Sequence, residues 1–592
     1  MKKDSKAARR KPPATRKILI SKTEIAAILD DMAGLLEIAG ANVFKIRAFT
    51  NAARELENLP GDLAQMVASG ELLDVQGIGK GIFAHIEEML ETGTFTEFEE
   101  LRAGMPEGLP GMLRVPGIGP RKVKTLHEEI GIKSVEELEL AAQTGQIADL
   151  PGFGEKSQEK ILSGIDRMRR YARRHLLSAA AESAAPVFER ISTHPGVQRS
   201  LLGGSLRRRK ETVKDIDILV SADESEAIMD TFTSLPGVVS VVARGSTKSS
   251  VVLESGINVD LRVVGDEEFP FAALYFTGSK EHNTDMRSRA KKMGYKLNEY
   301  GLFRDDKPTP CKDERAVFEK LGLDFIPPEL RESMGEIPAA ENHALPDLVG
   351  EGDIKGVFHA HTTYSDGAGT IREMAEGAKA LGLEYLGVAD HNRSAHYDGG
   401  LTVAKAREQA REIAELNESL EGFRVFHGVE PDILPDGALD FPQDGLAIFD
   451  YVVASVHKEF DMGEALMTRR VIKAIENPHT TVLGHPTGRI LLEHNAYRID
   501  VNAVIDAAAE NGVMIEINAH PSRLDLDWRY VRSARDRGVR LMIGPDAHSV
   551  EELDFFRYGV GVARKGWLVA ADLMNTLGAH EVKTLLQSRR KR

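Results

Sequence analysis

Residues 203–220 read Gly-Gly-Ser-Leu-Arg-Arg-Arg-Lys-Glu-Thr-Val-Lys-Asp-Ile-Asp-Ile-Leu-Val, and this stretch decides how the front half of the chain folds. Because side chains alternate along a β-strand, Asp215 and Asp217 face the same side of the strand predicted here. Two carboxylates that close need a divalent cation to offset their repulsion. The Gly204-Ser205 turn offers backbone N–H groups to a triphosphate, and Arg208 can neutralise it. The stretch therefore predicts a metal site beside a phosphate-binding turn.

A third carboxylate follows on another predicted strand. Runs of β-branched residues predict strands at 216–220, 238–242, 251–253 and 259–264. Asp260 lies in the last of these runs, so three carboxylates converge if its strand neighbours the one that carries Asp217. Such a triad is the ligand set for two Mg²⁺ ions about 3.5–4 Å apart, which activate an attacking hydroxyl and stabilise the leaving oxygen. A strand end with solvated acids is the alternative.

Three segments nearer the N-terminus share one glycine pattern. Residues 75–80, 115–120 and 150–155 each read as an apolar residue, a spacer and Gly-apolar-Gly, followed by a helical pattern. The glycines permit a tight turn that exposes backbone N–H groups at a helix N-terminus, which suits a phosphate. The apolar residue between them is expected to anchor the turn in the core. The residues of these turns that are predicted to contact phosphate are Gly77, Gly79, Lys80, Gly117, Gly119, Gly152 and Gly154.

A single such segment could equally be an ordinary glycine turn between helices. Three copies with basic residues nearby favour a common role, and the segments resemble the helix-hairpin-helix motif. Turns of that kind grip the DNA backbone without reading sequence, because phosphate contacts position a protein but do not specify bases.

Residues 21–330 resemble a family X DNA polymerase, with lyase-like, fingers, palm and thumb domains in the family's order. The resemblance rests on the turns, on the carboxylates and on two later segments, 275–279 (Tyr-Phe-Thr-Gly-Ser) and 298–302 (Asn-Glu-Tyr-Gly-Leu). It implies that the catalytic metal ligands are Asp215, Asp217 and Asp260. It implies that the incoming triphosphate contacts Gly204, Ser205 and Arg208, and that the sugar contacts Tyr275, Phe276 and Gly278. It further implies that Asn283 reaches the base edge and Arg287 the template strand.

The chain departs from this family at two places. The family's deoxyribose-phosphate lyase uses a lysine after the first helix-hairpin-helix turn, and that position is His85 here. Imidazole cannot form the Schiff base that a lysine amine forms, so we do not expect the lyase reaction unless Lys80 or Lys45 substitutes. Lys214 also stands where the family often has glycine before the first aspartate.

Histidines and carboxylates cluster at predicted strand ends in the C-terminal part. Past residue 351 the chain alternates strand and helix, with apolar strands predicted at 386–389, 451–455, 481–483, 514–517 and 540–543. In a parallel α/β barrel such strand ends form the active-site face. Imidazole and carboxylate ligands without thiolate favour Zn, Mn or Fe. The nine predicted ligands are His359, His361, Asp366, His391, Glu430, His457, His485, Asp546 and His548.

This pattern resembles the PHP (polymerase and histidinol phosphatase) domain over roughly residues 351–575. The resemblance implies a distorted TIM-like barrel and a site for three divalent metals (Mn²⁺, Zn²⁺ or Fe), with the expected residue type at all nine positions. Four neighbouring basic residues are weaker candidates for binding a substrate phosphate: Arg393, His396, Lys458 and Arg489.

The 592 residues carry a net charge of −15 and one cysteine, Cys311. A local basic run such as 207–210 can still contact DNA, because phosphate contacts depend on local charge. One cysteine excludes an internal disulfide and fits a reducing compartment. No stretch is long and apolar enough to predict a membrane span. The expected organisation is a disordered basic tail (1–20), lyase-like helix-hairpin-helix domain (21–95), helix-hairpin-helix fingers (96–174), palm (175–265), thumb (266–334), linker (335–350) and PHP domain (351–592).

Together these features predict a multidomain DNA-directed DNA polymerase, with a helical N-terminal region, an α+β palm and thumb, and an α/β PHP domain. We expect it to fill short gaps in DNA repair with Mg²⁺ or Mn²⁺ at the palm. The PHP domain is expected to process 3′ ends by a Mn²⁺-favoured 3′→5′ exonuclease or 3′-phosphatase reaction, with cleavage at abasic sites as a further activity. The expected partners are gapped or nicked template-primer DNA and dNTPs, and the expected state is a cytoplasmic, nucleoid-associated monomer.

Three alternatives stay open at this point. The PHP domain could act on a small phosphoester, or on the pyrophosphate that polymerisation releases. The protein could serve mainly as a DNA-end-binding scaffold with weak catalysis. The palm could belong to another nucleotidyltransferase, such as a tRNA or small-molecule adenylating enzyme, although the three helix-hairpin-helix turns argue against that.

Overall fold

The computed structural model describes residues 20, 22–58, 63–75, 77–106, 108–113, 115, 118–148, 150, 152–172, 174–392, 400–492 and 496–589. The predictions for the basic tail up to residue 19, Gly117, Arg393 and His396 lie outside these residues. The chain divides into two compact units, residues 1–173 and 174–592, and each is described by itself. Within the described ranges, no helix has both the length and the apolar character needed to cross a membrane.

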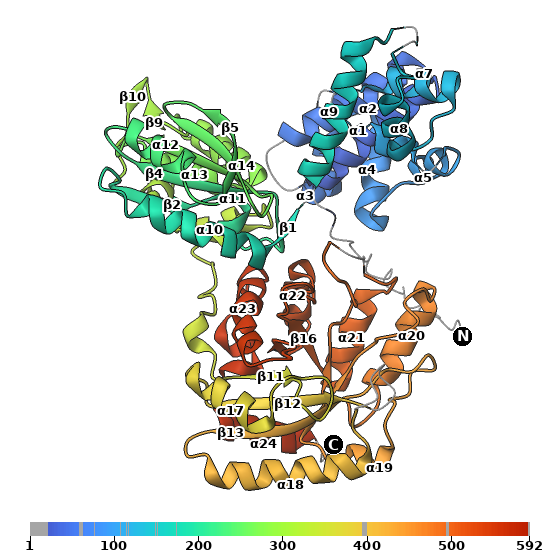
Figure 1. Ribbon diagram of the computed structural model, residues 1–592, viewed down its shortest axis with the longest axis vertical. Coiled ribbons are helices and arrows are strands. Elements are labelled where there is room, and N and C mark those ends of the chain that lie inside the picture. Colours follow the sequence, from blue (N-terminus) through green and yellow to red (C-terminus); the bar gives the residue numbers. More distant parts are fainter. Residues whose placement is uncertain are drawn as a thin grey trace, which may run out of the picture. The chain divides into compact units, whose positions relative to one another are not determined.

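The N-terminal unit is helical, as the periodicity predicts. Two hydrophobic clusters hold it together: one joins the first five helices and the other centres on the last four. Its helices are α1 (Lys22–Ile38), α2 (Val43–Asn58), α3 (Leu63–Ser69), α4 (Lys80–Thr92), α5 (Thr96–Ala103), α6 (Leu109–Met112), α7 (Pro120–Ile130), α8 (Val135–Gln143) and α9 (Glu155–Ala172). Figure 1 shows them in blue to teal.

The described residues of the three glycine turns share one hydrogen bond, and each turn precedes a helix. The backbone N–H of the apolar residue between the glycines donates to the carbonyl three residues earlier: Ile78 to Val75 (3.1 Å), Ile118 to Val115 (3.1 Å) and Phe153 to Leu150 (3.0 Å). Ile78 and Ile118 are buried in the two clusters, and Phe153 is partly buried. A Cβ atom added at Gly79, Gly119 or Gly154 would meet no atom within 4 Å. The second glycine of each turn therefore leaves open space beside a helix N-terminus.

A five-stranded sheet forms the palm, in the order β2-β4-β7-β6-β5. The strands are β2 (Arg199–Leu202), β4 (Asp215–Ser221), β5 (Val238–Arg244), β6 (Lys248–Leu253) and β7 (Asn258–Val264). The two central strands, β4 and β7, are parallel, and Asp217 pairs with Asp260 in register. A separate two-stranded sheet pairs β1 (His175–Leu176) with β3 (Thr212–Val213). All four predicted strands are present. The two that carry the carboxylates, β4 and β7, are the neighbouring central strands, which brings the carboxylates together.

The two faces of the palm sheet carry different side chains. The helices α10 (Leu177–Ser192) and α12 (Glu226–Thr233) pack on the face that carries Ile216, Ile218 and Val220. On the opposite face Leu219 packs against α13 (Phe269–Thr277). Because side chains alternate, Asp215 and Asp217 share this second face with Leu219. The pleat of one strand thus separates the core from the carboxylates.

The thumb follows the palm directly. It contains α13, α14 (Lys280–Lys292), β8 (Lys296–Asn298), β9 (Gly301–Arg304), β10 (Lys307–Pro308) and α15 (Glu314–Lys320). The stretch expected as a linker, 335–350, contains the short helix α16 (Glu336–Glu341), whose Ala340 is buried in the thumb core. Val349 is buried in the core of the C-terminal domain. This stretch therefore packs against both neighbours instead of running free between them.

A nearly closed barrel of seven parallel strands forms the C-terminal domain. The strands are β11 (Gly356–Ala360), β12 (Tyr385–His391), β13 (Arg424–Glu430), β14 (Tyr451–Ala454), β15 (Val482–Leu483), β16 (Met514–Asn518) and β17 (Leu541–Gly544). A parallel bridge between Ala360 and Ala547 links the two ends of the sheet. The spaces between the strands and the flanking helices are filled by the largest hydrophobic cluster.

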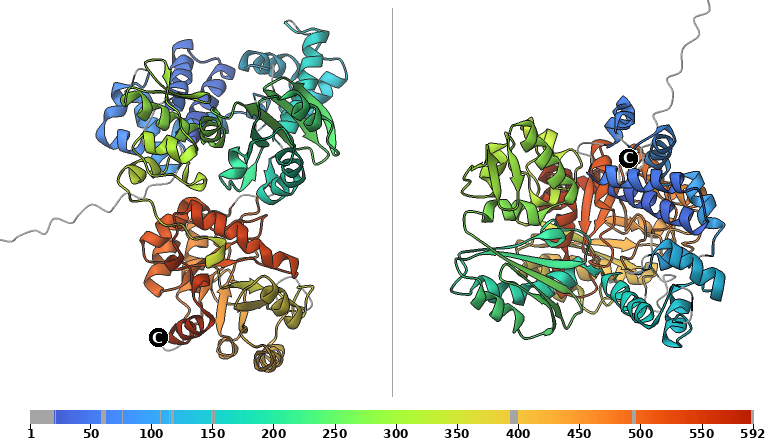
Figure 2. Two further views of the ribbon diagram at one scale, coloured as in Figure 1. Left: turned by 90° about the vertical axis from the view of Figure 1, so that its left-hand side faces the viewer. Right: turned by 90° about the horizontal axis from the view of Figure 1, so that it is seen from above.

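The helices of this domain, yellow to red, lie outside the strands in Figures 1 and 2. They are α17 (Ile371–Ala380), α18 (Val403–Ser419), α19 (Gln443–Leu446), α20 (Glu464–Ile475), α21 (Val501–Asn511), α22 (Trp528–Asp536), α23 (Phe556–Lys565) and α24 (Ala579–Arg589). Phe358, Tyr385, Phe426 and Tyr451 belong to a second cluster, to which α24 contributes Val582 and Leu586. The expected α/β barrel-like architecture is confirmed. Two of its strands, β11 and β13, were not predicted.

Candidate nucleotidyl-transfer and metal centres

The palm carboxylates meet across the central strand pair. Asp217 and Asp260 are register partners, and Asp215 lies two residues before Asp217 on the same face. Burial and the charges of Asp215 and Asp260 raise the pKa of Asp217 to about 7. Carboxylates that repel one another in this way fit divalent cations, whose charge would remove the repulsion.

Two residues of β6 that were not singled out in the sequence also belong to this site. The Nζ atom of Lys248 lies 2.6 Å from Asp260 Oδ2, and Ser250 Oγ donates to Asp260 Oδ1 at 2.5 Å. Since β6 is the antiparallel neighbour of β7, these side chains share the face of Asp260. They orient Asp260 from the side away from Asp217.

The predicted phosphate turn lies against Asp217. Gly204 has a φ of +59°, and a Cβ atom there would lie 2.3 Å from Asp217 Oδ2, so only glycine allows this close approach. The backbone N–H of Gly203 donates to the carbonyl of Asp217 at 2.7 Å. Ser205 follows within the short helix α11 (Gly204–Arg207). The structure thus brings Gly204 and the carboxylates together.

Arg208 lies next to the other predicted nucleotide contacts. Its Nη1 group donates to the carbonyl of Thr277 at 2.6 Å, and a Cβ atom at Gly278 would lie 2.9 Å from that Nη1. Its Nε group donates to Glu332 at 3.1 Å. Arg208 and Gly278 are therefore neighbours, and the arginine is held by fixed acceptors.

The remaining predicted contacts lie along α13 and α14. Asn283 donates through Nδ2 to the carbonyl of Tyr275 at 2.7 Å. The ring of Phe276 lies 4.2 Å from the guanidinium of Arg262, a β7 residue on the face of Asp260. Arg287 donates to Thr284 at 3.3 Å and lies at the surface. Tyr275, Asn283 and Arg287 line one small pocket, and the contact of Phe276 with Arg262 joins α13 to the face of Asp260.

The basic run 207–210 is engaged within the protein. Each of its cations has an acidic partner: Arg207 with Glu314 (2.8 Å), Arg208 with Glu332 (3.1 Å), Arg209 with Glu351 (3.8 Å) and Lys210 with Glu332 (3.9 Å). The four cations share three carboxylates, so the run keeps positive charge but is not a free patch, and its contact with DNA stays a prediction.

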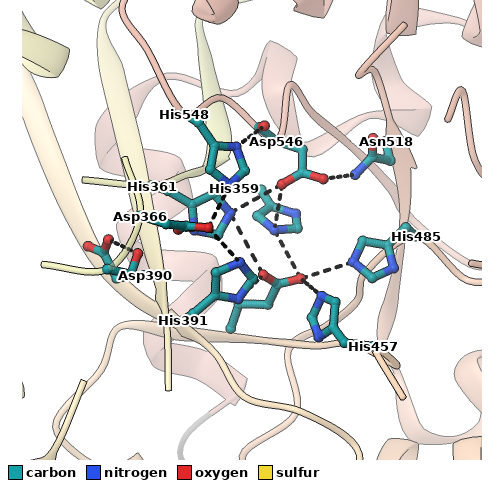
Figure 3. A network of polar contacts seen from close by, with 12 residues as sticks. His359, His361, Asp366, Asp390, His391, His457, His485, Asn518, Asp546 and His548 are labelled. Atoms are coloured by element: carbon teal, nitrogen blue, oxygen red, sulfur yellow. Dashed lines mark hydrogen bonds and ion pairs between the residues drawn. The ribbon is translucent and has the colours of Figure 1, made fainter. Parts of the chain in front are cut away.

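All nine predicted ligands of the C-terminal domain converge at the carboxyl ends of the barrel strands. Figure 3 shows the imidazoles and carboxylates pointing toward one another. Eight of them form three groups whose ligand atoms lie within 4.8 Å of one another: His361-Asp366-His391-His548, His359-His361-Asp546 and His391-Glu430-His457. The ninth, His485, has its Nε2 atom 3.1 Å from Glu430.

Glu430, at the end of β13, is the centre of the cluster. Its carboxylate lies within 3.0–3.4 Å of four imidazoles, those of His359, His391, His457 and His485. Burial alone would raise the pKa of Glu430, but the neighbouring histidines hold it well below its usual range. The carboxylate is therefore ionised inside the barrel mouth.

The cluster fits metal ions better than a closed hydrogen-bond network. Among the described residues, buried atoms without a hydrogen-bond partner include His359 Nε2, His361 Nδ1, Asp366 Oδ1 and Glu430 Oε2. Buried polar atoms normally have hydrogen-bond partners, so several unpaired atoms in one cluster fit the binding of metal ions. Imidazole nitrogens and carboxylate oxygens without a thiolate are typical of borderline divalent metals.

Residues behind the ligands fix their orientation, and these were not predicted from the sequence. Glu516 accepts a hydrogen bond from His359 Nδ1 at 2.6 Å and from the backbone N–H of His485 at 2.7 Å. Asp432 lies 3.0 Å from His457 Nδ1, and Asn518 donates to Asp546 at 3.0 Å. Such outer carboxylates hold metal-binding imidazoles in one tautomer. The one signal in the sequence was a glutamate, Glu516, inside the apolar run 514–517. The structure buries it fully.

The predicted basic neighbours differ in where they lie. Arg489 is held by Asp527 (2.7 Å) and by the carbonyl of Arg523 (3.0 Å), so its charge is already paired. Lys458 directly follows the ligand His457. Arg523, which was not predicted, has its Nε atom 3.5 Å from Asp546. Arg523 is thus the described arginine that reaches the cluster.

His85 occupies an aromatic niche in the N-terminal unit. Its ring packs against Phe49 and Phe95, with centroids 5.7 and 4.4 Å away, and its Nε2 atom lies 3.2 Å from Glu97. Lys45, one possible substitute for the missing lysine, forms an ion pair with the same Glu97. Glu97 is therefore the acidic neighbour of both the His85 imidazole and the Lys45 ammonium.

Four domain families match the chain. They are the helix-hairpin-helix domain at residues 21–95, the SAM-like helix-hairpin-helix tandem at 110–167, the DNA polymerase beta thumb at 272–332 and the PHP domain at 358–520. The helix-hairpin-helix and thumb matches imply DNA binding. The PHP match and the His/Asp/Glu cluster imply divalent metals.

Curated relatives cover the whole chain or its C-terminal part. The DNA polymerase/3′-5′ exonuclease PolX of Bacillus subtilis (strain 168) is 37% identical over 570 residues, 96% of this chain and 99% of that protein. A probable phosphatase of Caldanaerobacter subterraneus subsp. tengcongensis is 31% identical over 251 residues, 40% of this chain and 91% of that protein. One from Acetivibrio thermocellus is 30% identical over 207 residues, 33% of this chain and 81% of that protein. The full-length match, with the palm carboxylates and the barrel-mouth cluster, shows that the chain belongs to the PolX family, the family X DNA polymerases that carry a C-terminal PHP domain.

Proposed function

We propose that residues 21–330 extend a DNA 3′-hydroxyl by template-directed addition of dNTPs, filling short gaps during repair. The observation that carries this proposal is the in-register pair Asp217 and Asp260 on neighbouring parallel strands, with Gly204 packed against Asp217. Mg²⁺ or Mn²⁺ ions bound there would activate the attacking hydroxyl and stabilise the leaving oxygen.

The chain's own residues supply position and charge for this reaction. The three carboxylates would supply oxygen ligands for the metals, and Lys248 and Ser250 keep Asp260 in place. The turn at Gly204, packed against Asp217, would offer backbone N–H groups to a triphosphate, whose charge Arg208 would neutralise. Phe276 and Tyr275 on α13 would contact the sugar and limit ribonucleotides.

We propose that the PHP domain processes DNA 3′ ends as a Mn²⁺-favoured 3′→5′ exonuclease, with 3′-phosphatase or abasic-site cleavage as related activities. Three divalent ions (Mn²⁺, Zn²⁺ or Fe) would supply the positive charge that lowers the pKa of a water nucleophile and binds the phosphodiester. The residues supply the rest: Glu430 joins four imidazoles, Glu516 orients His359, and Arg523 offers a cation at the edge. The name of the Bacillus subtilis relative includes this exonuclease activity.

One gel tests both proposals. Gapped, 5′-phosphorylated DNA is incubated with the purified full-length protein and Mn²⁺, with and without dNTPs. We expect primer elongation with dNTPs and shortening without them. Asp217→Ala should abolish elongation and spare shortening, while His359→Ala should do the reverse. Loss of both activities in either folded variant would contradict the assignment of two sites.

A second candidate for the PHP domain is hydrolysis of a small phosphoester or of pyrophosphate. The relatives that match only this domain are named probable phosphatases, and they align over most of their own length. Phosphate release from a chromogenic phosphomonoester and from pyrophosphate, compared with digestion of 3′-mismatched DNA at equal enzyme, separates the two. Turnover on small esters without any DNA digestion would favour this candidate.

We further propose a monomer that acts in the cytoplasm on nucleoid DNA. Light scattering of the purified protein tests the monomer, and fractionation tests the location. If the protein were mainly a DNA-end-binding scaffold, turnover on a one-nucleotide gap would match that of Asp217→Ala. If the palm adenylated another substrate, DNA affinity would not fall steeply with salt.

A further inference from the structure

Lys565 of the PHP domain is an ammonium group without contact to water. It is the last residue of α23, and its side chain has no exposed surface. Its Nζ group donates to Glu332 Oε1 (2.8 Å), to the carbonyl of Arg208 (3.0 Å) and to the carbonyl of Glu329 (3.3 Å). An ammonium has three protons, so each has an acceptor, and all three acceptors lie in the palm and thumb.

Glu332 links this lysine to the nucleotide site. Its Oε1 atom accepts hydrogen bonds both from Lys565 and from Arg208 Nε, at 3.1 Å, while Lys210 lies 3.9 Å from Oε2. Burial alone would raise the pKa of Glu332, but Lys565, Arg208 and Lys210 lower it to about 2. A buried carboxylate of this kind depends on its cations, because an unpaired buried charge is very costly.

Arg208 is fixed from two sides by this arrangement. Its Nε group donates to Glu332, and its Nη1 group donates to the carbonyl of Thr277 at 2.6 Å. Among the described residues the Nη2 group has no hydrogen-bond partner, so it is the donor available to a phosphate. A planar guanidinium held at two nitrogens presents the third in one direction.

The rest of the same loop is also held by the PHP domain. Arg209 pairs with Glu351 at 3.8 Å, and Glu211 pairs with Arg489 at 3.5 Å. The Nζ atoms of Lys210 and Lys565 lie 5.1 and 4.6 Å from the ring of Trp528. Residues 209–211, which follow the phosphate turn, therefore all contact side chains of the PHP domain.

We propose that Lys565 is a positioning residue for DNA synthesis, which acts through Glu332 to hold Arg208 in the orientation that binds the dNTP triphosphate. The PHP domain is then a structural part of the polymerase nucleotide site, independently of its own metal cluster. This inference rests on the proposed role of Arg208 in nucleotide binding.

Steady-state synthesis on a one-nucleotide gap tests the proposal in the full-length protein. Lys565→Met keeps the length of the side chain and removes its charge. We expect the KM for the dNTP to rise about tenfold, the effect of losing a charge-assisted hydrogen bond, with a smaller change in kcat and an unchanged Kd for DNA. Lys565→Arg should restore part of the affinity. Glu332→Gln, which keeps the shape, should raise the KM similarly, and the double variant should be no worse than either single one.

Arg564→Met is the matched control. Arg564 precedes Lys565 on α23 and also pairs with the thumb, through Glu329 at 2.7 Å, but it does not contact Glu332 or Arg208. We expect its dNTP KM to stay within about twofold of wild type. A similar rise in both variants, or an unchanged KM in folded Lys565→Met and Glu332→Gln, would overturn the inference.

Two further variants separate this inference from the proposals beneath it. Arg208→Gln should raise the KM for the dNTP, and if it does not, the nucleotide role of Arg208 is wrong. His359→Ala should retain the wild-type KM while losing nuclease activity. If it too raises the KM, the effect comes from the PHP metal cluster and not from Lys565.

Discussion

His359 lies between two buried carboxylates: its Nδ1 atom is 2.6 Å from Glu516 Oε1, and its Nε2 atom is 3.2 Å from Glu430 Oε1. One carboxylate fixes the tautomer and the other shares the metal-facing side. The two strands that carry these glutamates, β13 and β16, are not adjacent in the barrel. The imidazole thus bridges separate parts of the barrel mouth.

Glu516→Gln should weaken metal binding without removing a ligand. The amide cannot hold His359 Nδ1–H as firmly as the carboxylate does, so the imidazole becomes a poorer ligand, typically by about 10–100-fold in metal affinity. Mn²⁺ titration of nuclease activity measures this change. Gap filling by the same preparation is the control and should be unchanged. Wild-type Mn²⁺ dependence in the variant would show that Glu516 does not support metal binding.

Metal binding at the palm should depend on pH around neutrality. Because the metal-free pKa of Asp217 is raised to about 7, a cation must displace a proton below that pH. Apparent Mg²⁺ affinity should therefore rise up to about tenfold per pH unit below pH 7 and level off above it. The Mg²⁺ dependence of gap filling between pH 5.5 and 8.5 measures it. A flat profile would contradict the repulsion described among the carboxylates.

Asp217→Asn should stabilise the metal-free protein while abolishing synthesis. The folded-state pKa of Asp217 lies above its unfolded value, so the protonated form favours the fold, and this contribution is lost as pH rises through about 7. The neutral amide avoids that loss, which is worth about 1.4 kcal/mol per unit of pKa shift. Thermal unfolding in EDTA should show a higher Tm for the variant at pH 8 and little difference at pH 4. A lower Tm at pH 8 would refute this account.

The deoxyribose-phosphate lyase reaction should be absent. His85 stands at the family's lysine position, and Lys45 is paired with Glu97. Borohydride treatment of the protein with 5′-deoxyribose-phosphate DNA should therefore trap no covalent adduct. A trapped adduct that disappears in Lys80→Ala would show instead that Lys80, the first residue of α4, performs the reaction.

A negative charge on a helix-hairpin-helix turn should weaken DNA binding without unfolding the domain. Gly79→Glu places a carboxylate in open space at the N-terminus of α4, beside the N–H groups that would meet a phosphate. Gly463→Glu is the matched control, because Gly463 also precedes a helix and has open space around it, but lies in the PHP domain. We expect a weaker Kd for gapped DNA in the first variant alone. Equal affinities would argue against phosphate contact at this turn.

The local pattern of the sequence was enough to find the palm carboxylates, and together with the resemblance to the PHP domain it named the nine barrel ligands. Alternation placed Asp215 and Asp217 on one face, and five of the nine ligands follow predicted strands, whereas His359, His361, Asp366 and Glu430 do not. The strands β11 and β13 were not predicted because each has few β-branched residues and carries histidine within it. Both strands are almost entirely buried, and the polar residues His359 of β11 and Glu430 of β13 belong to the metal cluster.

Contacts between distant segments could not be predicted. Lys248 and Ser250 join Asp260 only because β6 pairs with β7, and no local pattern marks them. The run 207–210 carries the composition of a DNA-binding patch, yet its carboxylate partners lie more than 100 residues away in the thumb and PHP domains. A charge run gives composition, but its role depends on which carboxylates the fold brings beside it.

The three ligand groups of the barrel mouth overlap: His361 belongs to two of them, and so does His391. An ion bound by one group would therefore change the geometry of the ligand that it shares with the next group. Cations should be taken up and released as a set, with a chelator removing nuclease activity over a narrow concentration range. The domain would then exist either fully loaded or empty, and partial loading would be scarce.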